Sequence, residues 1–537
     1  MPQKRTASSV SKKDSVQAAA TAATSPTSKD VKNEDLFAVY LEKTGEVGYV
    51  TQFSGSIIYA NGLPGCHPEE VVIFETGEIG YILSVHHDIL EIILLSPKQV
   101  AAGARVVRTM NGLQINAQEI LPGSTVILSQ MEKQLFSAAM SSSETTRSTF
   151  RALDETKLVF ADRQLITQPL ETGVSTVDML IPLGKGQREL VLGDRKTGKT
   201  NFLLQTLRTQ VQHGALCIYA LVGKPQLEIQ RVLDLASQPD IKQNTIVVAS
   251  HSADRAGLVH LTPYVAMTIA EHYKDLGRDV VLIIDDLTTH AHYYRELMLL
   301  AKRFPGRSSY PGDIFYVHAR LLERAGNFLH GSLSCFPVAQ SVAGDFSGFI
   351  QSNLMSMTDG HIFFDTNFFD QGRRPAINPF LSVTRVGEQT QSALQRQIGR
   401  HLRSFFVSNE KIKQFRHFQS ELGENVRSIF ETSERLTAML DQDAHQTVPV
   451  QINAFLYGLV WSDFWKGIDF IQMKNEMKHL ITQYQKDQGF HDQVTSWLQV
   501  LTTVDSLIEL CRTQYQTVLA MIMPLRKGSY ASSSQEK

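Results

Sequence analysis

The sequence contains the glycine-rich stretch Gly193-Asp194-Arg195-Lys196-Thr197-Gly198-Lys199-Thr200, which fits the pattern G-x-x-x-x-G-K-[S/T]. An apolar run over residues 189–192 comes directly before it and predicts a strand, while the pattern over residues 201–210 predicts a helix. Between a strand and a helix, such a loop points successive backbone N–H groups and the positive end of the helix at phosphate oxygens. The stretch therefore predicts a P-loop whose eight residues bind the phosphates of ATP or ADP.

A second apolar run, over residues 280–284, ends in the carboxylates of Asp285 and Asp286. P-loop sites use a carboxylate at the end of a neighbouring strand, together with the loop hydroxyl, to hold Mg²⁺. We therefore expect Thr200 and Asp285 to hold Mg²⁺. Asp286 is more simply explained as a helix N-cap, because aspartate is favoured at that position.

The pattern of apolar residues changes twice along the chain. Short β-branched runs between residues 46 and 107 predict a small β-barrel. From residue 165 to 394, β-rich segments (189–192, 216–221, 245–249, 280–284 and 334–337) alternate with amphipathic ones, which predicts a parallel sheet flanked by helices. Helical periodicity then dominates, as in residues 424–440 and 504–521. We predict a disordered tail (1–33), a β-barrel domain (34–110), a linker or hinge (111–160), a P-loop α/β domain (161–395) and a C-terminal helical domain (396–537).

Composition and charge exclude several classes of protein. The chain has 52 Lys and Arg against 54 Asp and Glu, so a general electrostatic attraction to nucleic acid is not expected. No apolar run reaches the roughly 18 to 20 residues that span a bilayer. Four widely spaced cysteines without a C-x-x-C pair predict reduced thiols rather than a zinc site or a disulfide framework. The polar tail leaves a removable targeting segment open as an alternative, although it is rich in Lys rather than Arg.

The P-loop and several other motifs resemble the alpha subunit of F-type ATP synthases. Its loop has the alpha-type form GDRxTGKT, and further motifs of the family occur at residues 173–178 (Gly-Val-Ser-Thr-Val-Asp), 305–316 (Pro-Gly-Arg-Ser-Ser-Tyr-Pro-Gly-Asp-Ile-Phe-Tyr) and 381–387 (Leu-Ser-Val-Thr-Arg-Val-Gly). The resemblance is specific over roughly residues 170–400. It implies a multidomain α/β fold with an N-terminal β-barrel, a central RecA-like P-loop parallel sheet and a C-terminal helical domain.

The same resemblance implies an assembly. The chain would alternate with catalytic beta subunits in a hexameric ring, around a central stalk gamma subunit and beside peripheral stalk subunits, in a complex that couples ATP synthesis or hydrolysis to proton transport. It would contact the membrane only through that complex. The expected location is the cytoplasmic face of a bacterial inner membrane, or the matrix side of the mitochondrial inner membrane.

The sequence also predicts binding without hydrolysis. Hydrolysis needs a group that orients and activates the attacking water, and in the family's beta subunit this is a Glu directly after a Gly. The corresponding residues 218–225 read Ile-Tyr-Ala-Leu-Val-Gly-Lys-Pro, which places Lys224 there. A lysine cannot polarise the water as a base. Glu228 is the alternative base, but Pro225 and the helical pattern of residues 226–235 oppose it.

The resemblance assigns two further groups of residues. Arg385 is in the position of an arginine finger, which would stabilise charge on the γ-phosphate of the neighbouring beta subunit; an ordinary salt bridge is the alternative. Phe369, Arg374, Pro375 and Gln442 would surround the adenine base. Ordinary core packing is the alternative for Phe369.

Some residues depart from the family pattern. Lys196 replaces a Gln in the loop, Gln340 replaces a Glu and Thr384 replaces a Ser, while the family's hinge motif is not recognisable in residues 112–150. An ancillary alpha-like subunit of an atypical ATPase therefore stays open. So does a self-sufficient ring ATPase, either a secretion-type motor or a Rho-like RNA translocase, although no catalytic carboxylate or basic aromatic surface supports it. A single residue separates His290 from His292 and no third ligand is evident, so we expect no metal site there.

Overall fold

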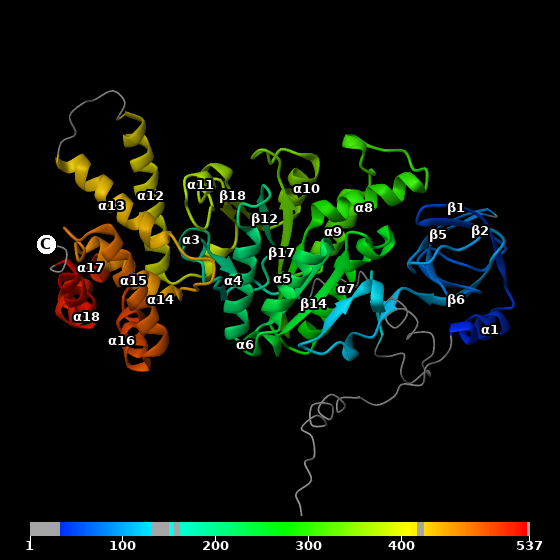
Figure 1. Cartoon of the computed structure of the whole chain (residues 1–537), viewed down its shortest axis with the longest axis horizontal. Helices are drawn as coiled ribbons and strands as arrows, with labels where there is room; N and C mark the ends of the chain where they lie inside the picture. The colour runs from blue at the N-terminus through cyan, green and yellow to red at the C-terminus, as the bar shows by residue number, and fades with distance from the viewer. Residues whose placement is uncertain (1–32, 88, 132–149, 155–161, 416–423, 534–537) are drawn as a thin grey trace, which may run out of the picture.

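The computed structural model describes residues 33–87, 89–131, 150–154, 162–415 and 424–533. The predicted tail therefore lies almost wholly outside the described residues. Along the long axis of the molecule the described residues form three parts: a barrel, a central sheet covered by helices, and a group of C-terminal helices (Figure 1). This is the predicted fold class, with each part in the predicted order.

The N-terminal part is a closed antiparallel barrel with the strand order β1-β2-β5-β4-β3-β6. β-branched residues such as Ile58, Val72 and Ile92 fill its interior and are fully buried, because alternate side chains of each strand point inward. The helix α1 packs on β6. The elements are α1 (Asn33–Thr44), β1 (Gly48–Ser54), β2 (Ile57–Asn61), β3 (Glu70–Phe74), β4 (Ile79–His86), β5 (Ile89–Leu94) and β6 (Arg105–Gly112).

The central part is a nine-stranded sheet with the order β19-β18-β12-β17-β15-β13-β14-β8, in which β16 pairs with β17. All neighbouring pairs are parallel except those of β19 and β16. The strands are β8 (Thr125–Ile127), β12 (Glu189–Gly193), β13 (Leu216–Lys224), β14 (Thr245–His251), β15 (Val280–Asp285), β16 (Gly326–Phe328), β17 (Gly331–Gln340), β18 (Gly360–Phe364) and β19 (Val383–Thr384). Each of the five predicted strands lies within one of them.

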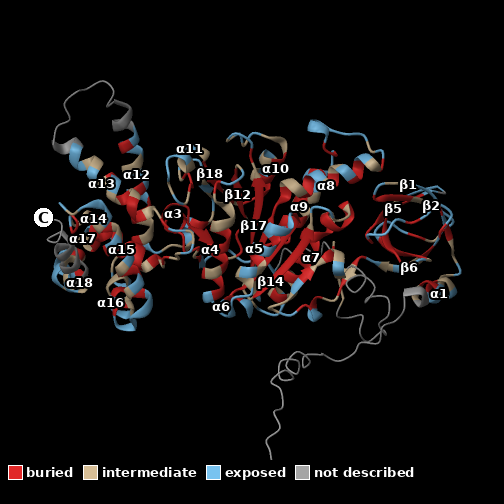
Figure 2. Ribbon diagram, in the orientation of Figure 1, coloured by how far each residue is buried: buried red, intermediate tan, exposed pale blue. Residues whose placement is uncertain are grey.

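Helices cover both faces of this sheet, which explains why its strands are apolar at nearly every position. In β12, Leu190 and Leu192 pack in the cluster that includes α7, α8 and α9, whereas Val191 packs in the cluster that includes α3 and α4. Figure 2 shows the sheet buried between them. The helices are α3 (Ser175–Leu180), α4 (Lys199–Gln212), α5 (Gln226–Ala236), α6 (Pro239–Lys242), α7 (Ala256–Asp275), α8 (Leu287–Leu300), α9 (Ile314–Glu323), α10 (Phe349–Met357) and α11 (Thr366–Asp370).

The C-terminal part is helical, and α14 lies at its centre in contact with α13, α15, α16 and α17. The helices are α12 (Ala393–Phe415), α13 (Glu424–Leu440), α14 (Val450–Trp461), α15 (Phe470–Lys486), α16 (Gln488–Gln499), α17 (Val504–Thr513) and α18 (Tyr515–Ser533). The expected helix over residues 504–521 is interrupted at Gln514, the C-cap of α17. No helix in the described ranges is both long and apolar enough to cross a membrane.

Residues 111–160, which we expected to form a linker, contribute one strand to the central sheet. β8 pairs in parallel with β14 at the sheet edge, with Val126 opposite Val248. In the same segment β7 (Gln114–Ile115) pairs with β9 (Arg151–Ala152), and β10 (Pro169–Leu170) later pairs with β11 (Leu183–Gly184). Residues 132–149 and 155–161 lie outside the described residues, and the division into domains remains a prediction.

Candidate nucleotide-binding site

The P-loop connects β12 to α4, as its sequence context predicts. Gly193 is the last residue of β12, and a Cβ atom there would lie 2.6 Å from both the Cβ atom and the carbonyl oxygen of Phe364. Gly198 has a φ of 104° and forms the N-cap of α4. Both glycines are therefore required by the backbone, one by a close approach and the other by its left-handed conformation.

Lys199 lies at the start of α4 and folds back onto the loop. Its Nζ atom donates hydrogen bonds of 2.6 Å to the carbonyl oxygens of Gly193 and Asp194. Burial lowers the pKa of Lys199 to about 8, against the opposing effect of the nearby carboxylates of Asp285 and Asp286. The ammonium group of the motif lysine is thus held against the loop backbone.

Asp194 braces the loop. Its Oδ1 atom accepts a hydrogen bond from the Ser341 hydroxyl at 2.6 Å, and its Oδ2 atom accepts from Gly344 N at 2.9 Å and from the Thr366 hydroxyl at 3.1 Å. The buried Thr197 hydroxyl donates to Asp194 O. These bonds connect the loop to the segments after β17 and β18. Both oxygens of the Asp194 carboxylate are hydrogen-bonded within the chain.

Lys224 lies at the carboxyl end of β13 and forms a buried ion-pair cluster with two aspartates. Its Nζ atom is 2.7 Å from Asp285 Oδ1 and 3.1 Å from Asp286 Oδ2. All three residues are buried, with Asp286 fully inaccessible. Burial alone would lower the pKa of Lys224, but the two carboxylates raise it well above its ordinary value. Glu228, the alternative base, lies on α5 with its carboxylate 3.7 Å from the same ammonium group.

The remaining oxygens of these carboxylates also have donors from the chain. The Tyr219 hydroxyl donates to Asp285 Oδ2 at 3.1 Å. Asp286 Oδ1 accepts from Thr289 N at 2.6 Å, which makes Asp286 the N-cap of α8 as expected, and its Oδ2 atom accepts from Gln340 Nε2 at 2.6 Å. Tyr219 carried no signal in the sequence, and Gln340 was visible only as a departure from the family pattern.

This donor set does not fit the expected Mg²⁺ site. Both oxygens of Asp285 are bonded, one by the Lys224 ammonium group and the other by Tyr219. A divalent cation would have to displace a buried positive charge from its two partners, and Mg²⁺ demands free oxygen ligands in near-ideal octahedral geometry. The structure therefore places Asp285 beside the loop but assigns its carboxylate to Lys224.

Arg385 lies far from the P-loop of its own chain. β18 and β12 are parallel, with Gly193 opposite Phe364, while β19 runs antiparallel with Thr384 opposite Gly360. Arg385 follows β19 and is therefore at the amino-terminal edge of strands whose carboxyl ends reach the loop, a separation of about 13 Å along the five-residue strands. Its side chain is exposed, and Nη1 donates to Thr358 O at 3.3 Å.

Comparison with known proteins agrees with this architecture. Residues 173–384 match the model of the ATP synthase alpha/beta family, nucleotide-binding domain. ATP synthase subunit alpha of Neorickettsia sennetsu is 31% identical over 484 residues, which cover 87% of this chain and 94% of the relative. ATP synthase subunit alpha 2 of Polaromonas naphthalenivorans is 35% identical, covering 80% and 82%, and its namesake in Syntrophus aciditrophicus is 37% identical, covering 76% and 79%.

The chain belongs to the ATP synthase alpha-subunit family. The match extends beyond residues 173–384 into the parts of the chain on both sides, because it covers 87% of the chain. Membership makes the chain a subunit of an ATPase complex and agrees with the P-loop as a nucleotide site.

The residues that we expected around the adenine base lie together and bond to one another or to other parts of the chain. The Arg374 guanidinium group stacks on the Phe369 ring, 3.8 Å from its centroid, and Arg374 O accepts a hydrogen bond from Gln442 N at 2.6 Å. The Gln442 side chain is buried, accepting from Ser175 N at 3.0 Å and donating to Gly173 O at 2.7 Å. Gln442 therefore joins α3 to the end of α13, and its amide is used within the chain.

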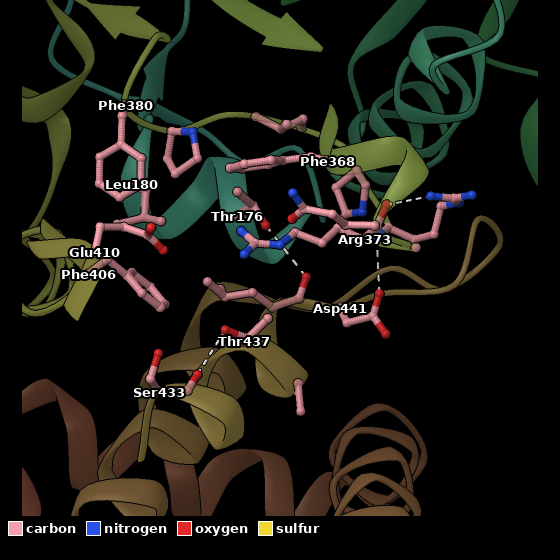
Figure 3. Close-up of a pocket in the computed structure, with 18 of the residues that line it drawn as sticks. Thr176, Leu180, Phe368, Arg373, Phe380, Phe406, Glu410, Ser433, Thr437 and Asp441 are labelled. Atoms are coloured by element: carbon pink, nitrogen blue, oxygen red, sulfur yellow. Dashed lines mark hydrogen bonds between the residues drawn. The ribbon is translucent and has the colours of Figure 1, made fainter. Parts of the chain in front are cut away.

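A cavity of about 250 Å³ opens beside this group, between the segment around α11 and the helices α12, α13 and α15 (Figure 3). Arg374 and Pro375 line it together with aromatic side chains that the sequence did not single out, Phe368, Phe380 and Phe406. The periodicity of apolar residues in the sequence could not reveal this cavity, because its walls come from segments that are distant along the chain.

The two histidines after β15 have separate environments in this alpha-family chain. His290 is fully buried, with Nδ1 3.1 Å from His318 Nε2, and its ring stacks on that of His260 at 4.9 Å between centroids. His292 instead stacks on Tyr310 at 6.2 Å. Within the described residues, no group of three or more His, Cys, Asp or Glu side chains could hold a metal ion.

This buried histidine cluster predicts acid sensitivity. Burial lowers the pKa of His290 from 6.5 to about 4, and it also lowers the pKa values of His260 and His318. A histidine kept neutral in the folded state stabilises fully above its unfolded pKa of about 6.5, and this contribution is lost as the pH falls toward 4, about 3 kcal/mol for His290. Thermal unfolding midpoints should fall over this pH range.

The variant His290→Gln, which cannot be protonated, should show a shallower decline of the midpoint between about pH 6.5 and 4. His445→Gln is the matched control, because His445 is exposed, and it should follow the wild-type curve. Parallel curves for wild type and His290→Gln would show that protonation of His290 does not control acid stability.

Proposed function

We propose that the chain is the alpha-type, non-catalytic subunit of a rotary F-type ATP synthase and binds ATP or ADP at its P-loop without hydrolysing it. The observation that carries this proposal is the ion pair of Lys224 with Asp285 and Asp286. Hydrolysis needs a free carboxylate or amide to orient water at this place. Here a charged lysine takes that place, and it also neutralises the nearest acids.

The phosphates would meet the loop N–H groups, the N-terminus of α4 and the Lys199 ammonium group. When bound in sites of this class, Mg²⁺ neutralises charge on the β- and γ-phosphates. The carboxylate of Asp285 is paired with Lys224. The proposal therefore does not include the expected binding of Mg²⁺ by Thr200 and Asp285.

The position of Arg385 supports a role across a subunit interface. An exposed guanidinium group at the sheet edge opposite the P-loop cannot reach the chain's own phosphates, but it is available to a neighbour. We infer that it stabilises charge on the γ-phosphate of a catalytic beta subunit in an alternating hexameric ring. Gamma and peripheral-stalk subunits would complete a peripheral complex, through which the chain reaches the membrane of a bacterium or the mitochondrial inner membrane.

Nucleotide binding by the purified chain tests the proposal. Wild type should bind a fluorescent ATP analogue and show negligible turnover, whereas Lys199→Ala should bind about 100-fold more weakly, because a charge-assisted contact to phosphate is lost. Lys98→Ala, which removes an exposed lysine of the barrel, is the matched control and should leave affinity unchanged.

Two outcomes would contradict the proposal. If Lys199→Ala bound the analogue as tightly as wild type, the nucleotide would not occupy the P-loop. Sustained hydrolysis by the purified wild-type chain would contradict a non-catalytic role, and it would favour the self-sufficient ring ATPase instead.

A further inference from the structure

We propose that the Lys224 ammonium group takes the place of Mg²⁺ at this nucleotide site, so that the chain binds ATP or ADP without a divalent cation. This inference rests on the proposed nucleotide binding and specifies its metal requirement. Hydrolysis would require a carboxylate or an amide at the position of Lys224. The inference gives this lysine a role in nucleotide binding.

The fold fixes the ammonium group directly beside Asp285, the acid that P-loop sites use to hold the metal. Lys224 is the last residue of β13, and β13 pairs in parallel with β15, with Leu221 opposite Asp285. Pro225 then begins the turn into α5, so the side chain of Lys224 extends from the rigid end of a central strand. The cation is therefore held by the sheet itself and is not a mobile surface charge.

Every carboxylate oxygen of Asp285 and Asp286 already accepts a bond from a donor of the chain. Lys224 Nζ lies 2.7 Å from Asp285 Oδ1 and 3.1 Å from Asp286 Oδ2. Each of the other two oxygens accepts a hydrogen bond, Asp285 Oδ2 from Tyr219 and Asp286 Oδ1 from Thr289 N. Gln340 Nε2 adds a second donor to Asp286 Oδ2 at 2.6 Å, so all four oxygens are bonded within the chain.

The two buried aspartates of the site are neutralised without a metal. Lys224 is ion-paired with Asp285 and Asp286 and also lies 3.7 Å from the exposed carboxylate of Glu228. Lys199 is near enough to both aspartates to interact with them electrostatically, so the formal charges of the two lysines and the two buried aspartates cancel. A divalent cation is attracted where carboxylates are in excess, as in ordinary Mg²⁺ sites. If Lys224 were neutral, the same group would carry one net negative charge and would regain that attraction.

The metal dependence of nucleotide affinity tests this inference in the unaltered protein. We would titrate wild type with a fluorescent ATP analogue in buffer containing magnesium chloride and in buffer containing EDTA. The two dissociation constants should differ by less than about threefold. An affinity at least about tenfold lower in EDTA would overturn the inference while leaving the proposed nucleotide binding intact. Absence of binding in both buffers would overturn the proposed function and the inference with it.

Two variants of Lys224 test whether its positive charge makes nucleotide affinity independent of Mg²⁺. Lys224→Gln removes the charge but keeps a donor for one aspartate, and its affinity should become at least about tenfold higher with Mg²⁺ than in EDTA. Lys224→Arg keeps the positive charge and should behave as wild type. A Lys224→Gln chain whose affinity is equal in both buffers would contradict the inference.

Retention of Mn²⁺ gives a readout that involves no activity. After incubation with Mn²⁺ and ADP and passage through a desalting column, wild type should keep nucleotide with little metal, whereas Lys224→Gln should keep both in similar amounts. Equal amounts of Mn²⁺ and ADP on wild type would overturn the inference. The wild-type measurements decide the question even if circular dichroism shows that Lys224→Gln does not fold.

Discussion

Replacing Arg385 with alanine is expected to lower the ATPase rate of the assembled complex by about 10³- to 10⁵-fold, the range over which an arginine finger accelerates phosphoryl transfer. The guanidinium group is exposed at the edge of the sheet opposite the P-loop, where it can approach a neighbouring subunit. Steady-state hydrolysis by a complex reconstituted from separately purified subunits measures the loss. The isolated Arg385→Ala chain should still bind nucleotide with wild-type affinity, because its own phosphates are bound elsewhere.

Two further variants separate this role from an ordinary surface charge. Arg385→Lys keeps a positive charge but loses the planar fork, so the rate should fall by an intermediate amount. Arg400→Ala removes an exposed arginine whose ion pair with Glu388 spans 3.7 Å, and the rate should change by less than about twofold because such pairs contribute little. Wild-type hydrolysis by the complex containing Arg385→Ala would refute a finger at this position.

The P-loop and the central sheet could be predicted because their signals are local. A strand, a glycine pattern and a helix follow one another within residues 189–210, and backbone geometry then requires Gly193 and Gly198 where the motif has them. The barrel was equally visible, since its β-branched runs are short and separated by turn residues. Alternation of strands and helices was enough to indicate the parallel sheet.

The partners of Lys224 could not be predicted, because they depend on which strands are neighbours. The sequence shows that Lys224 stands where a catalytic base would be, and it predicts that Asp285, 61 positions later, is a metal ligand. Only the parallel pairing of β13 with β15 brings the two side chains within 2.7 Å. The same reason applies to Gln442, whose amide bonds to α3 across 267 positions of sequence, and to β8, which pairs at the sheet edge from within the expected linker.

Replacing Lys224 with methionine is expected to destabilise the chain by about 3 to 5 kcal/mol, because removing one partner of a buried ion pair leaves unpaired charge in the interior. Asp286 is fully buried and Asp285 nearly so, and both would lose the same ammonium group. For a domain of about 150 to 250 residues, such a loss lowers the midpoint of thermal unfolding by roughly 6 to 20 °C. Differential scanning calorimetry of the purified chain measures this shift.

Lys196→Met is the matched control, since Lys196 is exposed in the P-loop, and its effect should stay within about 0.5 kcal/mol. The double variant Lys224→Met with Asp285→Asn should recover part of the lost stability, because one of the two unpaired charges is then removed. If Lys224→Met unfolded at the wild-type temperature, the cluster would not contribute to stability. A large loss that the double variant partly reverses would instead show that the Lys224 ammonium group neutralises the buried acids of the site.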